Sequence, residues 1–138
     1  MLRSSRGWQT FFVNGRIISS KALAKAVDNA YRSLIPNSGY PLAVLDIRVN
    51  PRSVDVNVHP QKSEVKFEDE GRLFRAVYKA IVDAIVEELA KYCEAIAAAA
   101  PTLPFYYYHI PAFNGAYLPM VELLGAVDGR IPNFAGIK

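Results

Sequence analysis

At residues 10–16 the chain runs Thr10-Phe11-Phe12-Val13-Asn14-Gly15-Arg16, and later it runs Val54-Asp55-Val56-Asn57-Val58-His59-Pro60-Gln61-Lys62-Ser63-Glu64-Val65-Lys66-Phe67. The first run is aromatic and β-branched and then breaks at Asn-Gly, which predicts a strand followed by a tight turn. In the second run, valines alternate with polar residues as far as Val58, which predicts a strand with one buried face. These two segments decide the fold of the first part of the chain.

A helix and another strand are predicted between them. Ser19 and Ser20 are natural N-caps. The apolar residues behind them repeat at helical spacing: Leu23, Ala26, Val27, Ala30 and Leu34. Residues 41–49 alternate as a half-buried strand, and residues 50–53 predict a tight turn.

A long helix is predicted from Glu70 to the alanine run at residues 97–100, where Pro101 ends it. Its apolar stripe is Leu73, Val77, Ala80, Ile81, Ala84, Ile85 and Leu89. The order strand, helix, strand, strand, helix predicts an α+β fold, with one small sheet that carries helices on one face.

The remaining residues predict a different architecture. Residues 103–110 are a wholly apolar and aromatic run, which is typical of a strand buried on both faces. Residues 118–127 have helical spacing, and residues 133–138 predict a second buried strand. Strand, helix and strand in this order predict one βαβ unit of a parallel sheet.

The first part resembles the MutL-type DNA mismatch repair proteins over about residues 5–91. The motif that carries the resemblance is F-V-N-G-R followed by D-V-N-V-H-P-x-K-x-E-V-x-F. The resemblance implies a domain at residues 1–92 that is the second, transducer domain of the family's ATPase region. It also implies a ribosomal-protein-like fold with a βαβ crossover of left hand, against the usual right-handed rule.

The resemblance assigns a role to Lys62. In the family, the lysine of H-P-x-K contacts the γ-phosphate of ATP that the preceding ATPase domain holds. An ammonium on a long stem suits a phosphate, and Pro60 stiffens the segment that carries it. The family's ATP-binding motifs belong to that preceding domain and are missing from these residues. We therefore expect ATP to be shared with a MutL-type ATPase domain, and we expect no hydrolysis by this chain alone.

Arg16, Lys21 and Lys25 are candidate residues for binding the DNA backbone. Lys21 and Lys25 stand at i and i+4 and therefore share one helix face. The family associates DNA binding with a basic residue near the start of this helix, and Lys21 occupies that place. Such contacts are salt-sensitive and involve no base readout. A solvated helix face explains the same residues equally well, and the turn alone explains Asn14-Gly15.

Residues 94–138 are similar to N-acetylneuraminate lyase, an aldolase of the dihydrodipicolinate synthase group with a (β/α)₈ barrel. The resemblance rests on the segment around Y-x-I-P and on a terminal G-I-K. It implies that Tyr108 is a proton shuttle and that Lys138 forms a Schiff base with pyruvate. It also implies a βαβ fragment of a barrel at residues 93–138. Two strands of eight do not make a barrel, so we expect both residues to be inert.

Composition excludes several classes of function. Residues 1–66 hold ten Lys and Arg against four Asp and Glu, whereas residues 93–138 hold two against three. This asymmetry favours a polyanion partner for the first part. His59 and His109 lie far apart, so no metal site is predicted. No segment is apolar enough to predict a membrane span, and the single Cys93 fits a reducing, cytoplasmic location.

The chain is thus interpreted as two unrelated fragments that join near residues 92–94. The leading hypothesis is a non-catalytic, ATP-sensing and DNA-associated domain of mismatch repair. The alternatives are a pyruvate-dependent aldolase fragment and a chimeric or designed scaffold without activity. Bare strand edges in the second fragment also predict that it pairs with another copy as a homo-oligomer.

Overall fold

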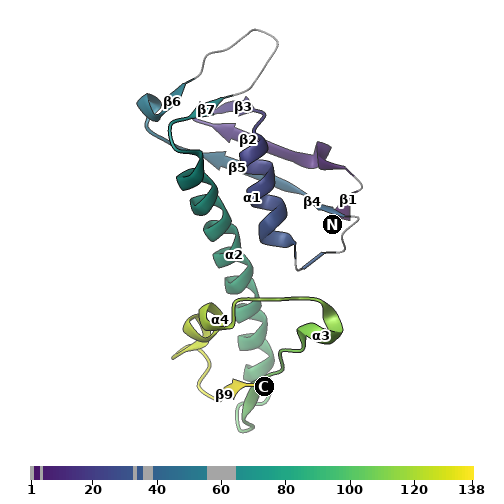
Figure 1. Ribbon diagram of the computed structural model, residues 1–138. Helices are drawn as coiled ribbons and strands as arrows, with labels where there is room; N and C mark the ends of the chain where they lie inside the picture. Colours follow the sequence, from purple (N-terminus) through teal and green to yellow (C-terminus); the bar gives the residue numbers. More distant parts are fainter. Residues whose placement is uncertain (1, 4, 33, 36–38, 56–64) are drawn as a thin grey trace. The chain divides into compact units, whose positions relative to one another are not determined.

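The structure is a computed structural model, and it describes residues 2–3, 5–32, 34–35, 39–55 and 65–138. The chain folds as two compact units, Met1–Ala80 and Ile81–Lys138. We call them unit 1 and unit 2. The long helix α2 (Glu70–Ala98) contributes residues to both (Figure 1). The join of two unrelated fragments near residues 92–94 stays a prediction, since the division into compact units does not test it.

The main sheet of unit 1 has three strands in the order β3-β2-β5. The central strand β2 (Gln9–Val13) pairs antiparallel with β3 (Arg16–Ile18) and parallel with β5 (Ala43–Ile47). Helix α1 (Lys21–Tyr31) lies between β3 and β5 in the chain. The parallel pair and the helix form the predicted βαβ crossover, and its left hand stays a prediction.

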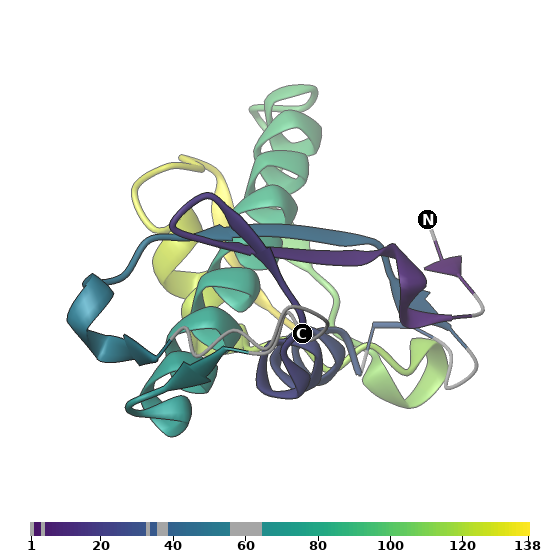
Figure 2. The same ribbon diagram turned by 90° about the horizontal axis from the view of Figure 1, so that it is seen from above.

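Helix α1 covers one face of this sheet (Figures 1 and 2). Four of the five apolar residues predicted for its inner face are buried: Leu23, Ala26, Val27 and Ala30. The sheet contributes Phe11, Val13 and Ile18 to the same core. Burying one Leu, Val, Ile or Phe side chain stabilises a fold by about 1.5–3 kcal/mol, so this layer accounts for much of the stability of unit 1. The Ser20 hydroxyl caps the helix and accepts from Leu23 N at 3.3 Å.

The other described strands of unit 1 form two separate pairs, so within the described residues the strands do not form the one sheet that was predicted. β1 (Leu2–Arg3) pairs antiparallel with β4 (Tyr40–Pro41), and β6 (Val54–Asp55) pairs antiparallel with β7 (Lys66–Phe67). Pro41 has no backbone N–H to extend a ladder. The 3₁₀ turn η2 (Pro51–Ser53) redirects the chain between β5 and β6. A second 3₁₀ turn, η1 (Arg6–Trp8), precedes β2.

Unit 2 is a small βαβ arrangement packed on the second half of α2. β8 (Phe105–Tyr107) and β9 (Phe134–Ile137) pair in parallel, and α3 (Pro111–Asn114) and α4 (Met120–Val127) lie between them in the chain. The buried core joins α2 to α4 and to the turn after it: Val86, Ala90, Cys93, Ala97, Leu123, Val127 and Ile131. The predicted strand, helix and strand are therefore present. Their presence does not show that they are a fragment of a barrel.

Two predictions about burial are wrong. The run at residues 103–110 is not buried on both faces, because Tyr106 is 46% and Tyr108 is 65% exposed. Only Phe105 and Tyr107 face the core of unit 2. The predicted apolar stripe of α2 holds at Leu73 and Val77 but fails at Ala80 and Ala84, which are exposed. Each compact unit buries its own residues of this helix, so no single stripe runs along it.

Polar side chains fix the end of α2 within unit 2. Asn133 Nδ2 donates to the carbonyl oxygens of Ala97, Ala100 and Leu103 at 3.3, 3.2 and 2.8 Å. Arg130 Nε donates to Glu94 Oε2 at 2.6 Å, and Arg130 also pairs with Glu87 at 3.0 Å. These contacts join the loop before β9 to α2.

Candidate functional site

The β2–β3 hairpin positions Arg16 at the surface of unit 1. Its turn has positive φ at both central residues, 49° at Asn14 and 79° at Gly15, as a type I′ hairpin turn requires. The Asn14 side chain also pairs with the backbone of Val49, since Nδ2 donates to Val49 O and Oδ1 accepts from Val49 N, both at 3.0 Å. Asn14 and Gly15 are therefore explained by structure alone.

Arg16 is exposed and lines a hollow of about 330 Å³ at the end of the hairpin. The other lining residues are Val13, Asn14, Ile18, Pro51, Val54 and Val65. Lys21 and Lys25 do not line this hollow. Ile18 lines it and also lines the groove that contains the two lysines, so Arg16 stands beside that groove.

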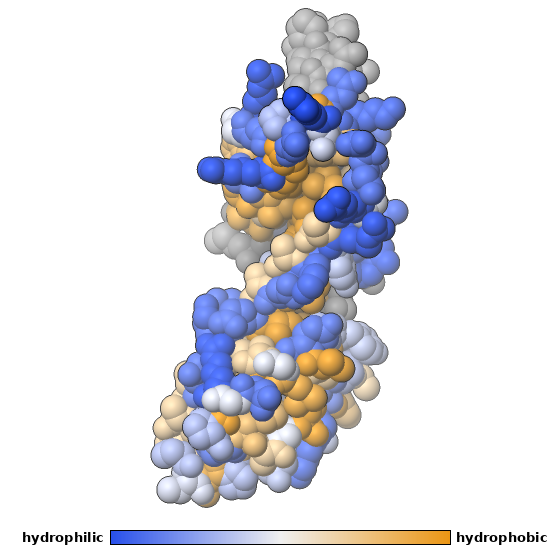
Figure 3. All heavy atoms as spheres, turned by 90° about the vertical axis from the view of Figure 1, so that its left-hand side faces the viewer, coloured by the Kyte–Doolittle hydropathy of each residue, from blue (hydrophilic) through white to orange (hydrophobic). Residues whose placement is uncertain are grey.

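Lys21 and Lys25 share an open groove of about 670 Å³ along α1. The charged residues that line it are Arg6, Lys21, Lys25, Asp28 and Arg32. We call this the α1 groove. Within the described part of the chain, neither Lys21 nor Lys25 forms an ion pair, and both are exposed. Their ammonium groups are thus available to an anion from solution. Figure 3 shows hydrophilic side chains around a hydrophobic area on the displayed face of unit 1.

Two basic residues of the groove were missed by sequence reasoning. Arg32 lies seven residues after Lys25, so the helical repeat alone would have placed it on the same face. Arg6 lies outside the helix, and its place follows from a tertiary contact. Its guanidinium pairs with Asp28 Oδ2, with Nη2 at 2.6 Å and Nε at 2.8 Å. No local pattern indicates such a contact.

Lys62, the predicted γ-phosphate contact, lies in residues 56–64 and therefore outside the described residues. The residues on both sides of this segment are described. Val54 pairs with Phe67 and Asp55 pairs with Lys66, so the described residues on the two sides of the segment lie next to each other. The side chains of Val54 and Phe67 are buried, which anchors this pair in the fold.

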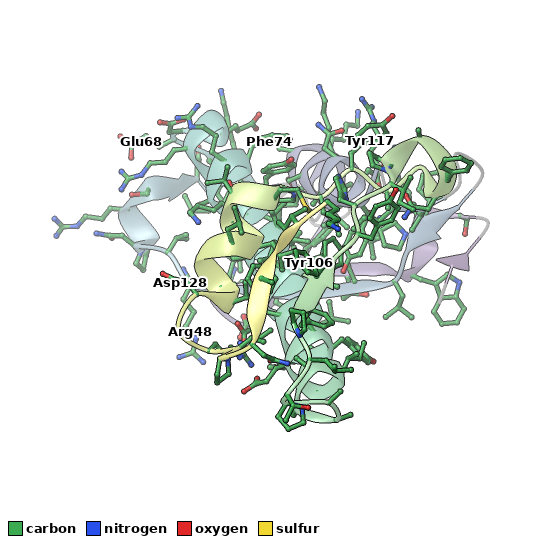
Figure 4. The ribbon with its side chains drawn as sticks, turned by 90° about the horizontal axis from the view of Figure 1, so that it is seen from below. Arg48, Glu68, Phe74, Tyr106, Tyr117 and Asp128 are labelled. Atoms are coloured by element: carbon green, nitrogen blue, oxygen red, sulfur yellow. The ribbon has the colours of Figure 1, made fainter. Side chains whose placement is uncertain are left out.

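Tyr108 and Lys138 follow the carboxyl ends of the parallel strands β8 and β9. Lys138 N donates to Tyr107 O at 2.9 Å, and His109 N donates to Lys138 O at 2.7 Å. Lys138 Nζ lies 4.6 Å from the centroid of the Tyr106 ring, and Tyr106 stands opposite Gly136 on β9 (Figure 4). Both predicted residues are exposed at this end of the pair.

The described residues contain no group of three or more His, Cys, Asp or Glu arranged to hold a metal ion. Among the helices of the described chain, none combines the length and the apolar character that a membrane crossing needs.

The described fold and groove define a class: a small α+β domain with a βαβ crossover and a basic face along its first helix. Comparison with known proteins then gives the family. The chain belongs to the family described as DNA mismatch repair protein, C-terminal domain, whose model matches residues 1–86.

Its relatives include several proteins named DNA mismatch repair protein MutL. The chain is 49% identical over 82 residues to the one from Thermoanaerobacter sp. (strain X514) and 46% identical over 84 residues to the one from Caldanaerobacter subterraneus subsp. tengcongensis. It is 46% identical over 87 residues to the one from Clostridium botulinum. These matches cover 59%, 61% and 63% of this chain but only 13%, 14% and 13% of the relatives.

The chain therefore spans a small part of the length of these relatives. The family match ends at Val86, inside α2. The aldolase resemblance of residues 94–138 has no counterpart in these matches, and it stays a prediction.

Proposed function

We propose that the mismatch repair domain of this chain binds the DNA backbone through the α1 groove and contacts the γ-phosphate of ATP through Lys62. The observation that carries the DNA part is the pair of exposed cations on one helix face, Lys21 and Lys25, with Arg32 farther along the same groove. Exposed ammonium and guanidinium groups bind phosphates and release counterions, which favours association. Contacts to phosphates carry no sequence information, so we expect binding that depends little on the DNA sequence.

Binding of a short DNA duplex by the full chain, measured by fluorescence anisotropy over a range of salt, tests this proposal. Replacing two phosphate contacts should reduce the steepness of the salt dependence by about two, because each contact contributes about one to the slope. We therefore expect Lys21→Gln with Lys25→Gln to weaken binding at least tenfold, an order-of-magnitude value. The matched control is Arg72→Gln with Arg75→Gln, which removes the same charge from exposed positions of α2. Equal binding by the two double variants would refute the DNA proposal.

The ATP part rests on the chemistry of Lys62 and on the described strands that flank its segment in the chain. An ammonium is a suitable partner for a terminal phosphate. The β6–β7 pair holds the two ends of the segment that carries Lys62 next to each other. ATP would be held by a separate MutL-type ATPase domain and would supply the phosphate, and this chain would contribute the lysine. ATPase turnover therefore needs both partners.

Turnover measured after mixing the chain with a MutL-type ATPase domain tests the role of Lys62. We expect Lys62→Ala to abolish the stimulation that the wild-type chain gives. Lys66→Ala is the matched control, because Lys66 is an exposed lysine of β7 close by in sequence. Stimulation that persists in Lys62→Ala and equals that of the control would exclude the ATP-sensing role.

A second candidate function concerns unit 2. Lys138 and Tyr108 lie at the carboxyl ends of adjacent parallel strands, which is where barrel enzymes place their chemistry. In the aldolase hypothesis the Lys138 amine condenses with the ketone of pyruvate and releases water, and borohydride then reduces the imine to a stable amine. Mass spectrometry should find this adduct on Lys138 and not in Lys138→Arg. Absence of the adduct, together with absence of DNA binding, would leave the inactive scaffold as the remaining reading.

A further inference from the structure

The basic stripe of the α1 groove contains one acidic residue. Lys21, Lys25, Asp28 and Arg32 follow one another at spacings of four, three and four residues. These spacings keep all four on one face of a helix. All four line the groove. A carboxylate therefore stands between Lys25 and Arg32, on the surface that the proposed function assigns to DNA phosphates.

Both oxygens of this carboxylate are already occupied within the protein. Arg6 donates to Oδ2 through Nη2 at 2.6 Å and through Nε at 2.8 Å. Gln9 Nε2 donates to Oδ1 at 2.9 Å. The Asp28 side chain is only 19% exposed, whereas that of Arg6 is 59% exposed. An approaching anion therefore meets the guanidinium more readily than the carboxylate.

Arg6 is held in this place by a second contact. Its guanidinium carbon lies 5.0 Å from the centroid of the Tyr40 ring, at a distance that permits a cation–π interaction. Tyr40 belongs to β4 and Asp28 to α1, so two different elements fix Arg6. These two contacts together keep the guanidinium against the Asp28 carboxylate.

We propose that Arg6 is a positioning residue for DNA: it masks the charge of Asp28 and so keeps the α1 groove attractive to the phosphate backbone along its whole length. Without Arg6, the Asp28 carboxylate repels a phosphate placed between Lys25 and Arg32. The cations on the two sides of Asp28 then attract the DNA backbone less strongly. Asp28 in turn limits the affinity, because it occupies the cation that would otherwise bind a phosphate. This inference rests on the proposed function of the α1 groove.

A set of three variants tests this masking role in the full chain, with a short DNA duplex as the probe and anisotropy as the readout. Arg6→Gln should weaken binding by about fivefold to tenfold, since it removes a cation and exposes an anion. Asp28→Asn should strengthen binding by about threefold or more and steepen the salt dependence by about one, because Arg6 is then available to a phosphate. Arg6→Gln with Asp28→Asn has the net charge of the wild type and should bind within about twofold of it.

The double variant separates masking from direct contact. If it binds as weakly as Arg6→Gln alone, Arg6 binds DNA itself and the inference is overturned. An Arg6→Gln variant that binds like the wild type also overturns it. Arg75→Gln is the matched control, because it removes one positive charge from α2 outside the groove, and it should leave binding unchanged.

Two further readouts keep the outcome decisive. Circular dichroism and the fluorescence of Trp8, the only tryptophan, report whether unit 1 is folded in each variant. If Arg6→Gln does not fold, the Asp28→Asn variant alone tests the inference. DNA binding by Asp28→Asn that is no stronger than that of the wild type then rejects it. The proposed function fails separately, when Lys21→Gln with Lys25→Gln has no effect. If that variant weakens binding and Arg6→Gln does not, only the masking role of Arg6 is lost.

Discussion

Cys93 and Tyr107 are two ionisable residues of unit 2, of which the first is buried and the second is half-buried. Cys93 belongs to the buried core, and Tyr107 packs against it from β8. Burial raises the pKa of the Cys93 thiol above its ordinary value of 9.0. Burial also raises the pKa of Tyr107 above its ordinary value of 10.0, and the nearby Cys93 raises it further. The neutral forms of both residues are therefore the forms that fit the fold.

This predicts that unit 2 loses stability in alkaline solution. A group whose pKa is raised by folding contributes stability that is present below its unfolded pKa and is lost as pH rises through its folded pKa. We expect the free energy of unfolding, measured with urea and far-ultraviolet circular dichroism, to decrease as pH rises above 9.0. Cys93→Ala removes one of the two groups and should make this decrease smaller. An unchanged decrease in the variant would contradict the role of Cys93.

Single residues of the candidate site differ in how far sequence predicts them. Lys21 and Lys25 were predicted from their spacing, and Arg32 continues the same spacing. Arg6 could not be predicted, because its relation to Asp28 depends on how η1 packs against α1. Arg16 was grouped with the lysines, but the structure places it in the adjoining hollow. Charge and spacing therefore reveal residues on one element, and tertiary structure decides which elements meet.

At the scale of elements, the end of α2 depends on one side chain from a distant part of the chain. The last carbonyl groups of a helix have no partner within it. The Asn133 amide donates to the carbonyl oxygens of Ala97, Ala100 and Leu103, and so connects the end of the helix to the residues before β9. A serine hydroxyl could donate only one hydrogen bond here, and an ionised aspartate or an alanine could donate none.

We expect Asn133→Ala to destabilise unit 2 by about 1–3 kcal/mol, because an intramolecular hydrogen bond contributes about 0.5–1.5 kcal/mol and this amide makes several. Asn114→Ala is the matched control, because the Asn114 side chain accepts one hydrogen bond, from Ala116 N at 2.9 Å. That variant should change the free energy of unfolding by about 0.5 kcal/mol or less. Urea unfolding of both variants checks this prediction, and equal losses would show that the Asn133 contacts contribute little.

The sequence predicts the elements that have strong periodicity, but it does not predict which of these elements pair or pack together. The inner face of α1, the turn at Asn14-Gly15 and the end of the long helix before Pro101 follow from local chemistry. The division of the strands into small pairs does not, because pairing depends on where the chain is redirected. The aromatic run of β8 shows a further limit. Its composition is that of a buried strand, but its exposed face at Tyr106 and Tyr108 is decided by what packs on it.

At the scale of the whole molecule, the boundary between the compact units, after Ala80, differs from the join predicted near residues 92–94. The core of unit 2 uses Val86 and Ala90, which precede the predicted join near residues 92–94, as well as Leu123 and Val127, which follow it. The residues before that join are thus part of the packing of the residues after it. Two sequence fragments of separate origin would have to agree at this helix to give the observed core.

Val86→Asp tests whether unit 2 depends on the residues before the join. Burying a carboxylate without a partner is costly, so we expect the β8–β9 amides to exchange hydrogen much faster in this variant. DNA binding by unit 1 should remain. Ala84→Asp places the same charge two residues earlier on an exposed position of α2 and should leave the exchange unchanged. Slow exchange in Val86→Asp would mean that Val86 is dispensable.

The hydrogen bonds of Asn14 also affect its rate of deamidation. An Asn-Gly pair loses ammonia when the glycine nitrogen attacks the side-chain amide, and the chain contains two such pairs, at Asn14 and Asn114. Both polar atoms of the Asn14 side chain are bonded to Val49, whereas the Asn114 side chain accepts one hydrogen bond, from Ala116 N. We expect deamidation during storage to appear first at Asn114, as peptide mass spectrometry would show. The hairpin beside the α1 groove should keep its chemical identity for as long as Asn14 remains paired with Val49.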